Sequence, residues 1–295
     1  MRYYREDFLR SRDGAQLFWS LHGEGSPPLV MSDGLGCDGF AWKYLLRHLT
    51  PTHRVLRWHY RGHGRSALPE AEVEIGIETF ADDLDEVMDA AGIPKAVILG
   101  HSMGVQVNFE FHKRHPERAL ALVPICGSYG NPLDTVHDDN TLKRVFPYLR
   151  RLVDAFPDLS RRVAQAVLPT EAALQYALWL EVNRRLVRRE DFAPYFAHLA
   201  RMDPRVFLRT LESAAQHSAW EHLPSIDVPT LVIAADHDRF TPLWLSERMH
   251  RAIRRSELQV VQSASHTAVI EMPELIALRI ERFLKERLRA PAQDA

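Results

Sequence analysis

Short runs of purely apolar residues recur along this chain, and each is separated from the next by a helical pattern. The clearest run is Ala96-Val97-Ile98-Leu99, in which neither alternate face carries a polar residue. A strand without a polar face is typical of a parallel sheet that helices cover on both sides. Amphipathic helical spacing over residues 79–92 and 103–115 flanks this run. The alternation predicts an α/β fold with a mostly parallel central sheet.

Other segments extend the same alternation towards both ends of the chain. Residues 5–9 and 15–20 surround the turn Arg12-Asp13-Gly14 and predict a hairpin. We expect Thr79 to cap the helix that follows it, because its hydroxyl accepts backbone hydrogen bonds. Right-handed connections between parallel strands would place helices on both faces of the sheet. Further strands are expected at 29–31, 55–58, 120–123, 230–234 and 258–261, and further helices at 40–49, 243–253 and 273–288.

The alternation is interrupted after residue 128. Residues 129–223 lack apolar strand runs and indicate several short amphipathic helices, with breaks at Pro147, Pro157, Pro169, Pro194 and Pro204. We therefore expect a core domain built from residues 1–128 and 224–295, with residues 129–223 inserted as a helical cap or lid.

Composition and charge exclude several functional classes. The chain has 37 Lys and Arg against 39 Asp and Glu, a net charge of -2 that offers no basic footprint for nucleic acid. The two cysteines, Cys37 and Cys126, have no metal-ligand spacing and indicate a reducing compartment. Neither a signal-peptide pattern nor a membrane-spanning apolar stretch is present, so we expect a cytoplasmic location.

The segment Gly100-His101-Ser102-Met103-Gly104 directly follows the apolar strand and opens the next helix. In this setting a G-x-S-x-G pattern predicts a nucleophilic serine on a sharp strand-to-helix turn. The flanking glycines allow neighbouring backbone to pass without a Cβ clash. The backbone N–H of Met103, at the positive end of the helix, would bind a developing oxyanion.

A serine hydroxyl needs a base, because it is a poor nucleophile at neutral pH. Of the 15 histidines, His266 fits best, since it follows the strand 258–261 at the edge of the sheet where active sites gather. A carboxylate must orient the imidazole, and Asp236 and Asp238 both follow the strand 230–234.

These motifs resemble those of α/β-hydrolase-fold serine hydrolases, in particular the esterase, lactonase and perhydrolase-like group. The resemblance covers nearly the whole chain and only loosely the helical insertion. The family's acid lies four residues before a proline, and Pro242 therefore selects Asp238 over Asp236. Residues 265–273 are similar to the family's G-H-x-x-x-x-E-x-P motif, and residues 61–66 to its R-G-x-G-x-S turn.

The resemblance also implies an oxyanion loop, and here the chain departs from the family pattern. The family commonly has H-G-x-G, whereas this chain has Asp33-Gly34-Leu35-Gly36. The backbone N–H of Leu35 would be the second oxyanion donor, and the change does not remove it. Asp33 either brings a carboxylate to the substrate or is a turn residue that binds nearby backbone N–H groups.

Aromatic residues around the insertion could line an apolar substrate pocket. The candidates are Tyr129, Trp179, Phe207, Trp220, Phe240 and Trp244. His237 lies between two aspartates, but consecutive loop residues rarely converge on one ion, so we expect no metal and no cofactor.

The predicted activity is cleavage of a small to medium carboxylic ester or lactone through an acyl-enzyme, with water as the second substrate. Ser102, His266 and Asp238 would be nucleophile, base and orienting acid. The same residues would serve thioester cleavage, C–C bond hydrolysis or perhydrolysis. A slow-turnover ligand receptor on this fold remains an alternative. We expect a small-molecule partner and no nucleic acid, and a homodimer is compatible with the sequence.

Overall fold

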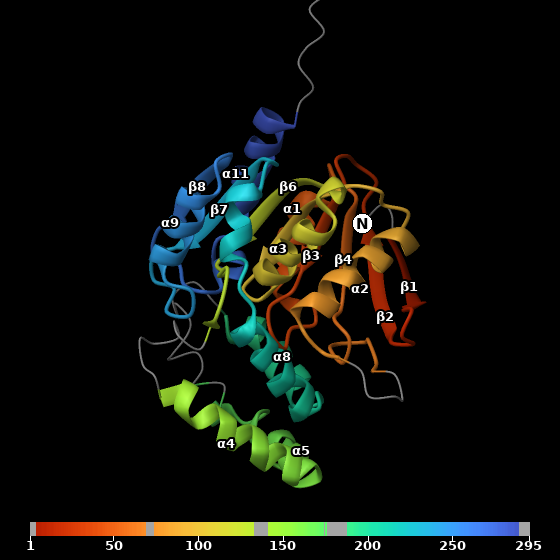
Figure 1. Ribbon diagram of the computed structural model, residues 1–295, viewed down its shortest axis with the longest axis vertical. Helices are drawn as coiled ribbons and strands as arrows, with labels where there is room; N and C mark the ends of the chain where they lie inside the picture. The colour runs from red at the N-terminus through yellow and green to blue at the C-terminus, as the bar shows by residue number, and fades with distance from the viewer. Residues whose placement is uncertain (1–3, 69–73, 133–140, 174, 176–187, 289–295) are drawn as a thin grey trace, which may run out of the picture.

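The computed structural model describes residues 4–68, 74–132, 141–173, 175 and 188–288. Its centre is an eight-stranded sheet in the order β1-β2-β4-β3-β5-β6-β7-β8 (Figure 1). Pairing is antiparallel from β1 through β2 to β4 and parallel from β4 to β8, which confirms the predicted mostly parallel sheet. The strands are β1 (Tyr4–Arg10), β2 (Gln16–His22), β3 (Leu29–Ser32), β4 (Val55–Trp58), β5 (Ala96–His101), β6 (Ala119–Ile125), β7 (Thr230–Ala235) and β8 (Ser256–Val261).

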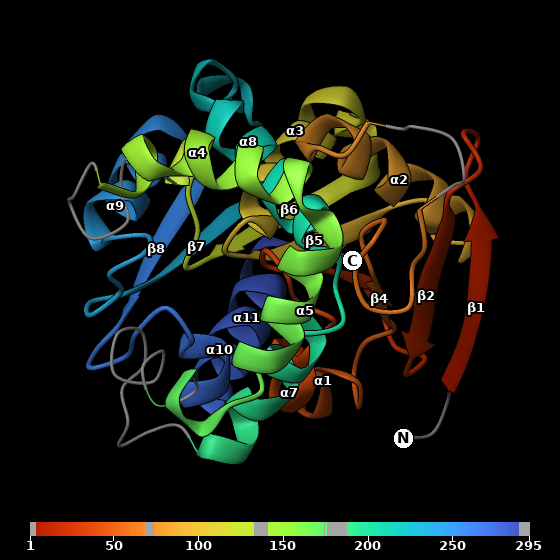
Figure 2. The same ribbon diagram turned by 90° about the horizontal axis from the view of Figure 1, so that it is seen from below.

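Helices cover both faces of the sheet, as the purely apolar strands predict (Figure 2). Along β3, Leu29 and Met31 pack into one hydrophobic cluster, whereas Val30 packs into a second cluster on the other face. The first cluster includes side chains of α1 and α11, and the second includes side chains of α2, α3 and α9. These helices are α1 (Lys43–Leu49), α2 (Ile77–Ala90), α3 (Gly104–Arg114), α9 (Leu243–Ala252) and α11 (Pro273–Arg287).

One predicted helix begins with a 3-10 turn, and the predicted start of another was wrong. The helix expected at 40–49 is a 3-10 turn over Phe40–Trp42 followed by α1. Thr79 does not cap α2, which begins two residues earlier at Ile77. The backbone N–H of Ile77 instead donates to Ser213 Oγ at 3.0 Å. Because Ser213 lies far away in the sequence, no local pattern could reveal this partner.

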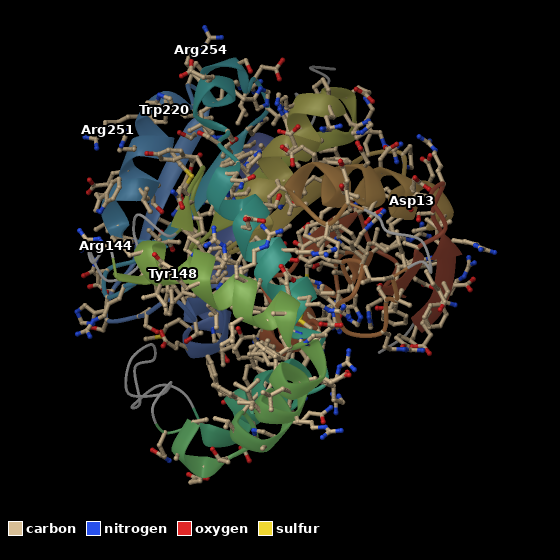
Figure 3. All side chains as sticks on the ribbon, turned by 60° about the horizontal axis from the view of Figure 1, so that its bottom comes forward. Asp13, Arg144, Tyr148, Trp220, Arg251 and Arg254 are labelled. Atoms are coloured by element: carbon tan, nitrogen blue, oxygen red, sulfur yellow. The ribbon has the colours of Figure 1, made fainter. Side chains whose placement is uncertain are left out.

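Between β6 and β7 the described residues form helices and no strand. α4 and α5 pack against α8 at one end of the molecule, away from the sheet (Figure 1). The outer face of α4 carries Tyr148, which is 70% exposed, close to Arg144 (Figure 3). In the described ranges no helix is long and apolar enough to cross a membrane. The helices of this stretch are α4 (Thr141–Ala155), α5 (Pro157–Val167), α7 (Arg189–Leu199) and α8 (Pro204–Gln216), followed by a 3-10 turn over Trp220–Ser225.

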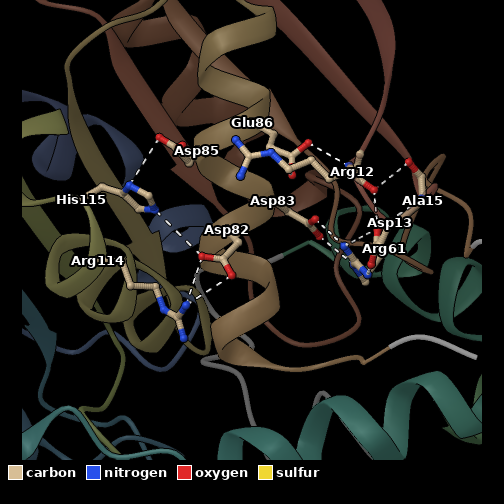
Figure 4. A network of polar contacts seen from close by, with 11 residues as sticks. Arg12, Asp13, Ala15, Arg61, Asp82, Asp83, Asp85, Glu86, Arg114 and His115 are labelled. Atoms are coloured by element: carbon tan, nitrogen blue, oxygen red, sulfur yellow. Dashed lines mark hydrogen bonds and ion pairs between the residues drawn. The ribbon is translucent and has the colours of Figure 1, made fainter.

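A buried arginine anchors the turn after β4. Arg61 donates from Nε and Nη2 to the two carboxylate oxygens of Asp83 on α2, at 2.9 and 2.6 Å (Figure 4). It also pairs with Asp13 in the turn between β1 and β2. Burial alone would lower the pKa of Arg61, but the two carboxylates outweigh burial and raise it. The charged guanidinium therefore ties hairpin, turn and helix together.

Replacing Arg61 tests how much it contributes to the stability of the fold. Arg61→Met leaves the Asp83 carboxylate buried without a counter-charge, so we expect the free energy of unfolding to fall by about 3 kcal/mol. Urea unfolding at pH 7 measures this change. Arg12→Met is the matched control, because Arg12 is exposed and pairs only loosely with Glu86, at 3.7 Å. Equal losses for the two variants would contradict the anchor role.

Candidate active site

Ser102 lies at a strained turn between the end of β5 and the start of α3. Its φ angle is +56°, in the left-handed region that non-glycine residues rarely occupy. The glycines on either side are required by close backbone packing. A Cβ on Gly100 would lie 2.6 Å from the carbonyl oxygen of Gly104, and a Cβ on Gly104 would lie 2.3 Å from that of Ser32. The sequence G-x-S-x-G thus follows from the geometry of this turn.

The three side chains predicted to act together meet at one edge of the sheet. His266 Nε2 lies 2.9 Å from Ser102 Oγ, and His266 Nδ1 lies 2.9 Å from Asp238 Oδ2. Asp238 follows β7 and His266 follows β8, so neighbouring parallel strands bring them together. Asp236, the alternative acid, makes neither contact. With its Nδ1–H donated to the carboxylate, the imidazole presents the Nε2 lone pair to the serine hydroxyl.

Asp238 is held in its ionised form although it is only 5% exposed. Its Oδ1 accepts the backbone N–H groups of Phe240 and Thr241, both at 2.8 Å, and its Oδ2 accepts the Thr241 hydroxyl at 2.7 Å. Burial raises the pKa of Asp238, but His266 and Thr241 outweigh burial and bring the pKa below its ordinary value of 3.8. The carboxylate is therefore charged at neutral pH and can stabilise an imidazolium.

The loop that carries His266 is fixed from several directions. Glu271 accepts hydrogen bonds from the backbone N–H of Ser265 at 2.6 Å and from the Thr267 hydroxyl at 3.1 Å. His101 Nε2 lies 2.8 Å from the carbonyl oxygen of His266. Burial lowers the pKa of His101 to about 4, so this ring is neutral and donates its Nε2–H to that oxygen. Glu271 thus fixes Ser265 and Thr267, the two residues on either side of His266.

The two predicted oxyanion donors lie beside the serine. Gly34 packs against the turn, since a Cβ placed on it would be 3.2 Å from Ser102 Cβ. Met103 precedes the first residue of α3, where backbone N–H groups have no partner within the helix. Within the described ranges, no atom accepts a hydrogen bond from the N–H of Leu35 or of Met103. Both groups are therefore available to a negative charge.

A cavity of about 380 Å³ borders Ser102, and some of the expected aromatic residues line it. Phe207 and Phe240 line it, together with Leu35 and Met103. Sequence reasoning missed most of the other walls, which come largely from the helices between β6 and β7. Among them are Phe40, Phe146, Phe192, Tyr195, Leu208 and Leu211. The missed polar residue Gln106 had a readable signal, because it lies in the first turn of the helix that begins directly after the serine turn.

Other predicted pocket residues lie elsewhere. Tyr129 packs against Trp220, with ring centroids 5.0 Å apart, outside the described lining of the cavity. Arg248 lies over both rings and over Trp244, which is 41% exposed. Trp179 lies outside the described residues. In the part of the chain that the structure describes, no group of three or more His, Cys, Asp or Glu is placed to hold a metal ion.

Asp33, the first residue after β3, is buried and is not among the described residues that line the cavity. It is 2% exposed, and its Oδ1 is buried without a hydrogen-bond partner among the described atoms. Its backbone carbonyl accepts the Tyr60 hydroxyl at 2.8 Å. Burial raises the pKa of Asp33 to about 7, and the nearby charge of Arg57 opposes part of this rise. The carboxyl group thus titrates near neutral pH.

This titration makes stability depend on pH. Because the pKa of Asp33 rises from 3.8 to about 7 on folding, the folded state binds the proton more tightly, and stability falls as pH rises through that interval. Asp33→Asn removes the titration. We expect the variant to gain about 3 kcal/mol relative to wild type between pH 5 and pH 8, measured by urea unfolding. A stability difference that does not change with pH would contradict the raised pKa.

Comparisons with known proteins identify the family of the chain. Residues 27–273 match the alpha/beta hydrolase fold family. The RutD protein of Azorhizobium caulinodans, named a carbamate hydrolase, is 27% identical over 264 residues, covering 88% of this chain and 92% of that protein. A hydrolase from Pseudomonas aeruginosa superposes with a TM-score of 0.75 at 25% identity, covering 95% of this chain and 98% of that one.

An enol-lactonase from Burkholderia xenovorans shares the fold, with a TM-score of 0.75 at 23% identity over 95% of this chain and all of its own, 100%. The family match spans strands β3 to β8, the serine turn and the histidine loop, but not the hairpin of β1 and β2. The chain therefore belongs to the alpha/beta hydrolase fold family, and the three similar proteins named above are hydrolases.

Proposed function

We propose that this chain is a serine hydrolase that cleaves carboxylic esters, lactones included, of small to medium size. The observation that carries the proposal is the pair of 2.9 Å contacts that link Ser102 Oγ, the His266 imidazole and the Asp238 carboxylate. A base that is oriented by a buried anion and touches a hydroxyl is the arrangement that activates a serine.

The proposed reaction has two stages. In the first, Ser102 Oγ attacks the ester carbonyl carbon while its proton passes to His266 Nε2, and Asp238 stabilises the imidazolium. The carbonyl oxygen becomes an oxyanion that accepts hydrogen bonds from the N–H groups of Leu35 and Met103. Each hydrogen bond stabilises the transition state by about 3 kcal/mol. His266 then protonates the leaving alcohol, and the acyl group stays on the serine.

In the second stage water is the nucleophile. His266 takes a proton from the water as its oxygen attacks the acyl carbon, and the second tetrahedral intermediate uses the same N–H groups. Collapse returns the proton from His266 to Ser102 Oγ and releases the acid. Because a protein group handles each proton, the proposal includes no metal and no cofactor.

We also propose that residues 129–223 form a cap over a core of residues 1–128 and 224–295. Support comes from the cavity walls, which combine Leu35 and Phe240 with Phe146, Tyr195 and other side chains of the intervening helices. A largely apolar wall favours an apolar acyl or alcohol chain in the substrate.

A carbamate is the second candidate substrate, because the RutD relative is named a carbamate hydrolase. The same serine could attack a carbamate carbonyl, which is less electrophilic than an ester because nitrogen donates electrons to it. Turnover of matched ester, lactone, thioester and carbamate substrates, with identification of the acid released, separates these activities. Tight retention of one ligand without repeated turnover would instead favour a receptor on this fold.

Removing the nucleophile tests the proposal most simply. We expect wild type to hydrolyse p-nitrophenyl butyrate and to gain one covalent adduct at Ser102 from a fluorophosphonate, detected by mass spectrometry. Ser102→Ala should lose the adduct and lower kcat by about 10⁴-fold or more. Ser225→Ala, an exposed serine outside the described cavity lining, should keep both properties. A wild-type protein with neither label nor turnover rejects the proposal.

The neighbouring aspartates provide a matched pair for the orienting acid. Asp238→Asn should lower kcat by about 10³- to 10⁴-fold, because an amide no longer fixes the Nδ1–H tautomer or stabilises the imidazolium. Asp236→Asn makes the same chemical change two residues away, at a side chain that does not touch His266. Steady-state kinetics on one ester should show the large loss only for Asp238→Asn. A similar loss in both variants would refute the assignment of the acid.

A further inference from the structure

The cavity beside Ser102 contains an amide group whose orientation is fixed from behind. Gln106 on α3 lines the cavity and is 2% exposed. Its Nε2 donates to the carbonyl oxygen of Ala214 at 2.9 Å and lies 3.3 Å from His217 Nδ1. If His217 Nδ1 is an acceptor, both amide hydrogens are used inside the protein.

The partner on the far side of His217 determines which nitrogen of the ring accepts. His217 Nε2 lies 3.2 Å from a carboxylate oxygen of Glu110, which also accepts from Arg114 Nε at 2.8 Å. The hydrogen bond from His217 lowers the pKa of Glu110 to about 2, so this carboxylate is charged and can only accept. His217 Nε2 therefore carries a proton, and in the neutral ring Nδ1 is the acceptor for the Gln106 Nε2–H.

The opposite orientation of the amide is excluded by the same contacts. Turning Gln106 over would point its oxygen at the Ala214 carbonyl oxygen and at the Nδ1 lone pair of His217, so that acceptors would face acceptors. Glu110, through His217, thus fixes the amide so that its Nε2 points towards Ala214 and His217.

The amide oxygen is left as an acceptor that the protein does not use. Within the described ranges no group donates a hydrogen bond to Gln106 Oε1. The oxygen is also not one of the fully buried polar atoms that lack a partner, so it keeps some contact with open space. Because the residue is almost fully buried yet borders the cavity, the cavity is the space that this oxygen faces. A donor placed there would satisfy the hydrogen-bonding capacity of this oxygen.

The surrounding wall favours an uncharged donor. None of the described lining residues is a lysine or an arginine, and the hydroxyls of Ser128, Tyr195 and Thr267 are neutral groups. A carboxylate in this space would meet the Gln106 oxygen and find no cation among those residues, at a high desolvation cost. A hydroxyl or an amide N–H would complement the oxygen instead.

We propose that Gln106 Oε1 forms a specificity subsite for an uncharged substrate that carries a hydrogen-bond donor, a hydroxyl or amide N–H, on an otherwise apolar chain. This inference rests on the proposed ester hydrolysis and names the substrate class for it. His217 and Glu110 are positioning residues that keep the oxygen turned towards the substrate.

The wild-type enzyme tests the subsite without any variant. The substrates are p-nitrophenyl esters of increasing acyl length, each made in three forms that end in a methyl, a hydroxyl or a carboxylate. At the length that reaches Gln106, kcat/KM for the hydroxyl form should exceed that of the methyl form by about tenfold. The carboxylate form should be the poorest. A hydroxyl-to-methyl ratio of one at every length overturns the subsite.

Three variants test whether Gln106 causes the hydroxyl-to-methyl ratio of kcat/KM. Gln106→Leu removes the acceptor and should bring the hydroxyl-to-methyl ratio to about one. His217→Leu frees the amide to turn and should lower the ratio without changing the most reactive chain length. Gln165→Leu makes the first change on an exposed residue of α5 and should keep the wild-type ratio. A wild-type ratio retained in Gln106→Leu would also overturn the proposal.

Failure of this subsite is distinguishable from failure of the proposed function. If no ester is hydrolysed and Ser102 takes no fluorophosphonate label, the ester hydrolase itself is rejected. If the methyl-ended esters are hydrolysed but the hydroxyl forms gain nothing, ester hydrolysis stands and only the role of Gln106 falls.

Discussion

The contact between the Asp238 carboxylate and His266 Nδ1 is the interaction on which the proposed chemistry depends. An anion at this nitrogen fixes the ring proton there and leaves Nε2 as the acceptor that faces Ser102. The buried carboxylate stays ionised because backbone N–H groups and the Thr241 hydroxyl donate hydrogen bonds to it in place of water. Without this local solvation, a carboxyl group with so little exposure would bind a proton.

The sheet supplies the rigidity that this contact requires. Parallel strands buried on both faces hold their carboxyl ends at one edge, so the turns after β5, β7 and β8 converge there. Each turn is then fixed locally, by glycine packing around Ser102 and by Glu271 beside His266. The buried pair of Arg61 and Asp83 holds the turn after β4 in a comparable way. The site thus depends on backbone that has little freedom to move.

What could be predicted from the sequence was what local chemistry encodes. The apolar strand before Ser102, the glycines around it and the positions of Asp238 and His266 after strands are all local signals. Contacts between distant residues gave no such signal: Ser213 capping α2, and His217 orienting Gln106, are separated from their partners by more than a hundred positions. The cavity walls were missed for the same reason, since Phe146 and Tyr195 lie on helices whose packing the sequence pattern does not specify.

The position of the ring proton on His266 shows whether Asp238 orients the base. Nitrogen-15 NMR of histidine-labelled protein at neutral pH reports the tautomer, and comparison with His266→Gln identifies the signal among the 15 histidines. We expect a proton on Nδ1 and an unprotonated Nε2 in the free enzyme. A neutral ring protonated on Nε2, with a bare Nδ1 beside Asp238, would contradict it, because such a histidine could not take the proton from Ser102.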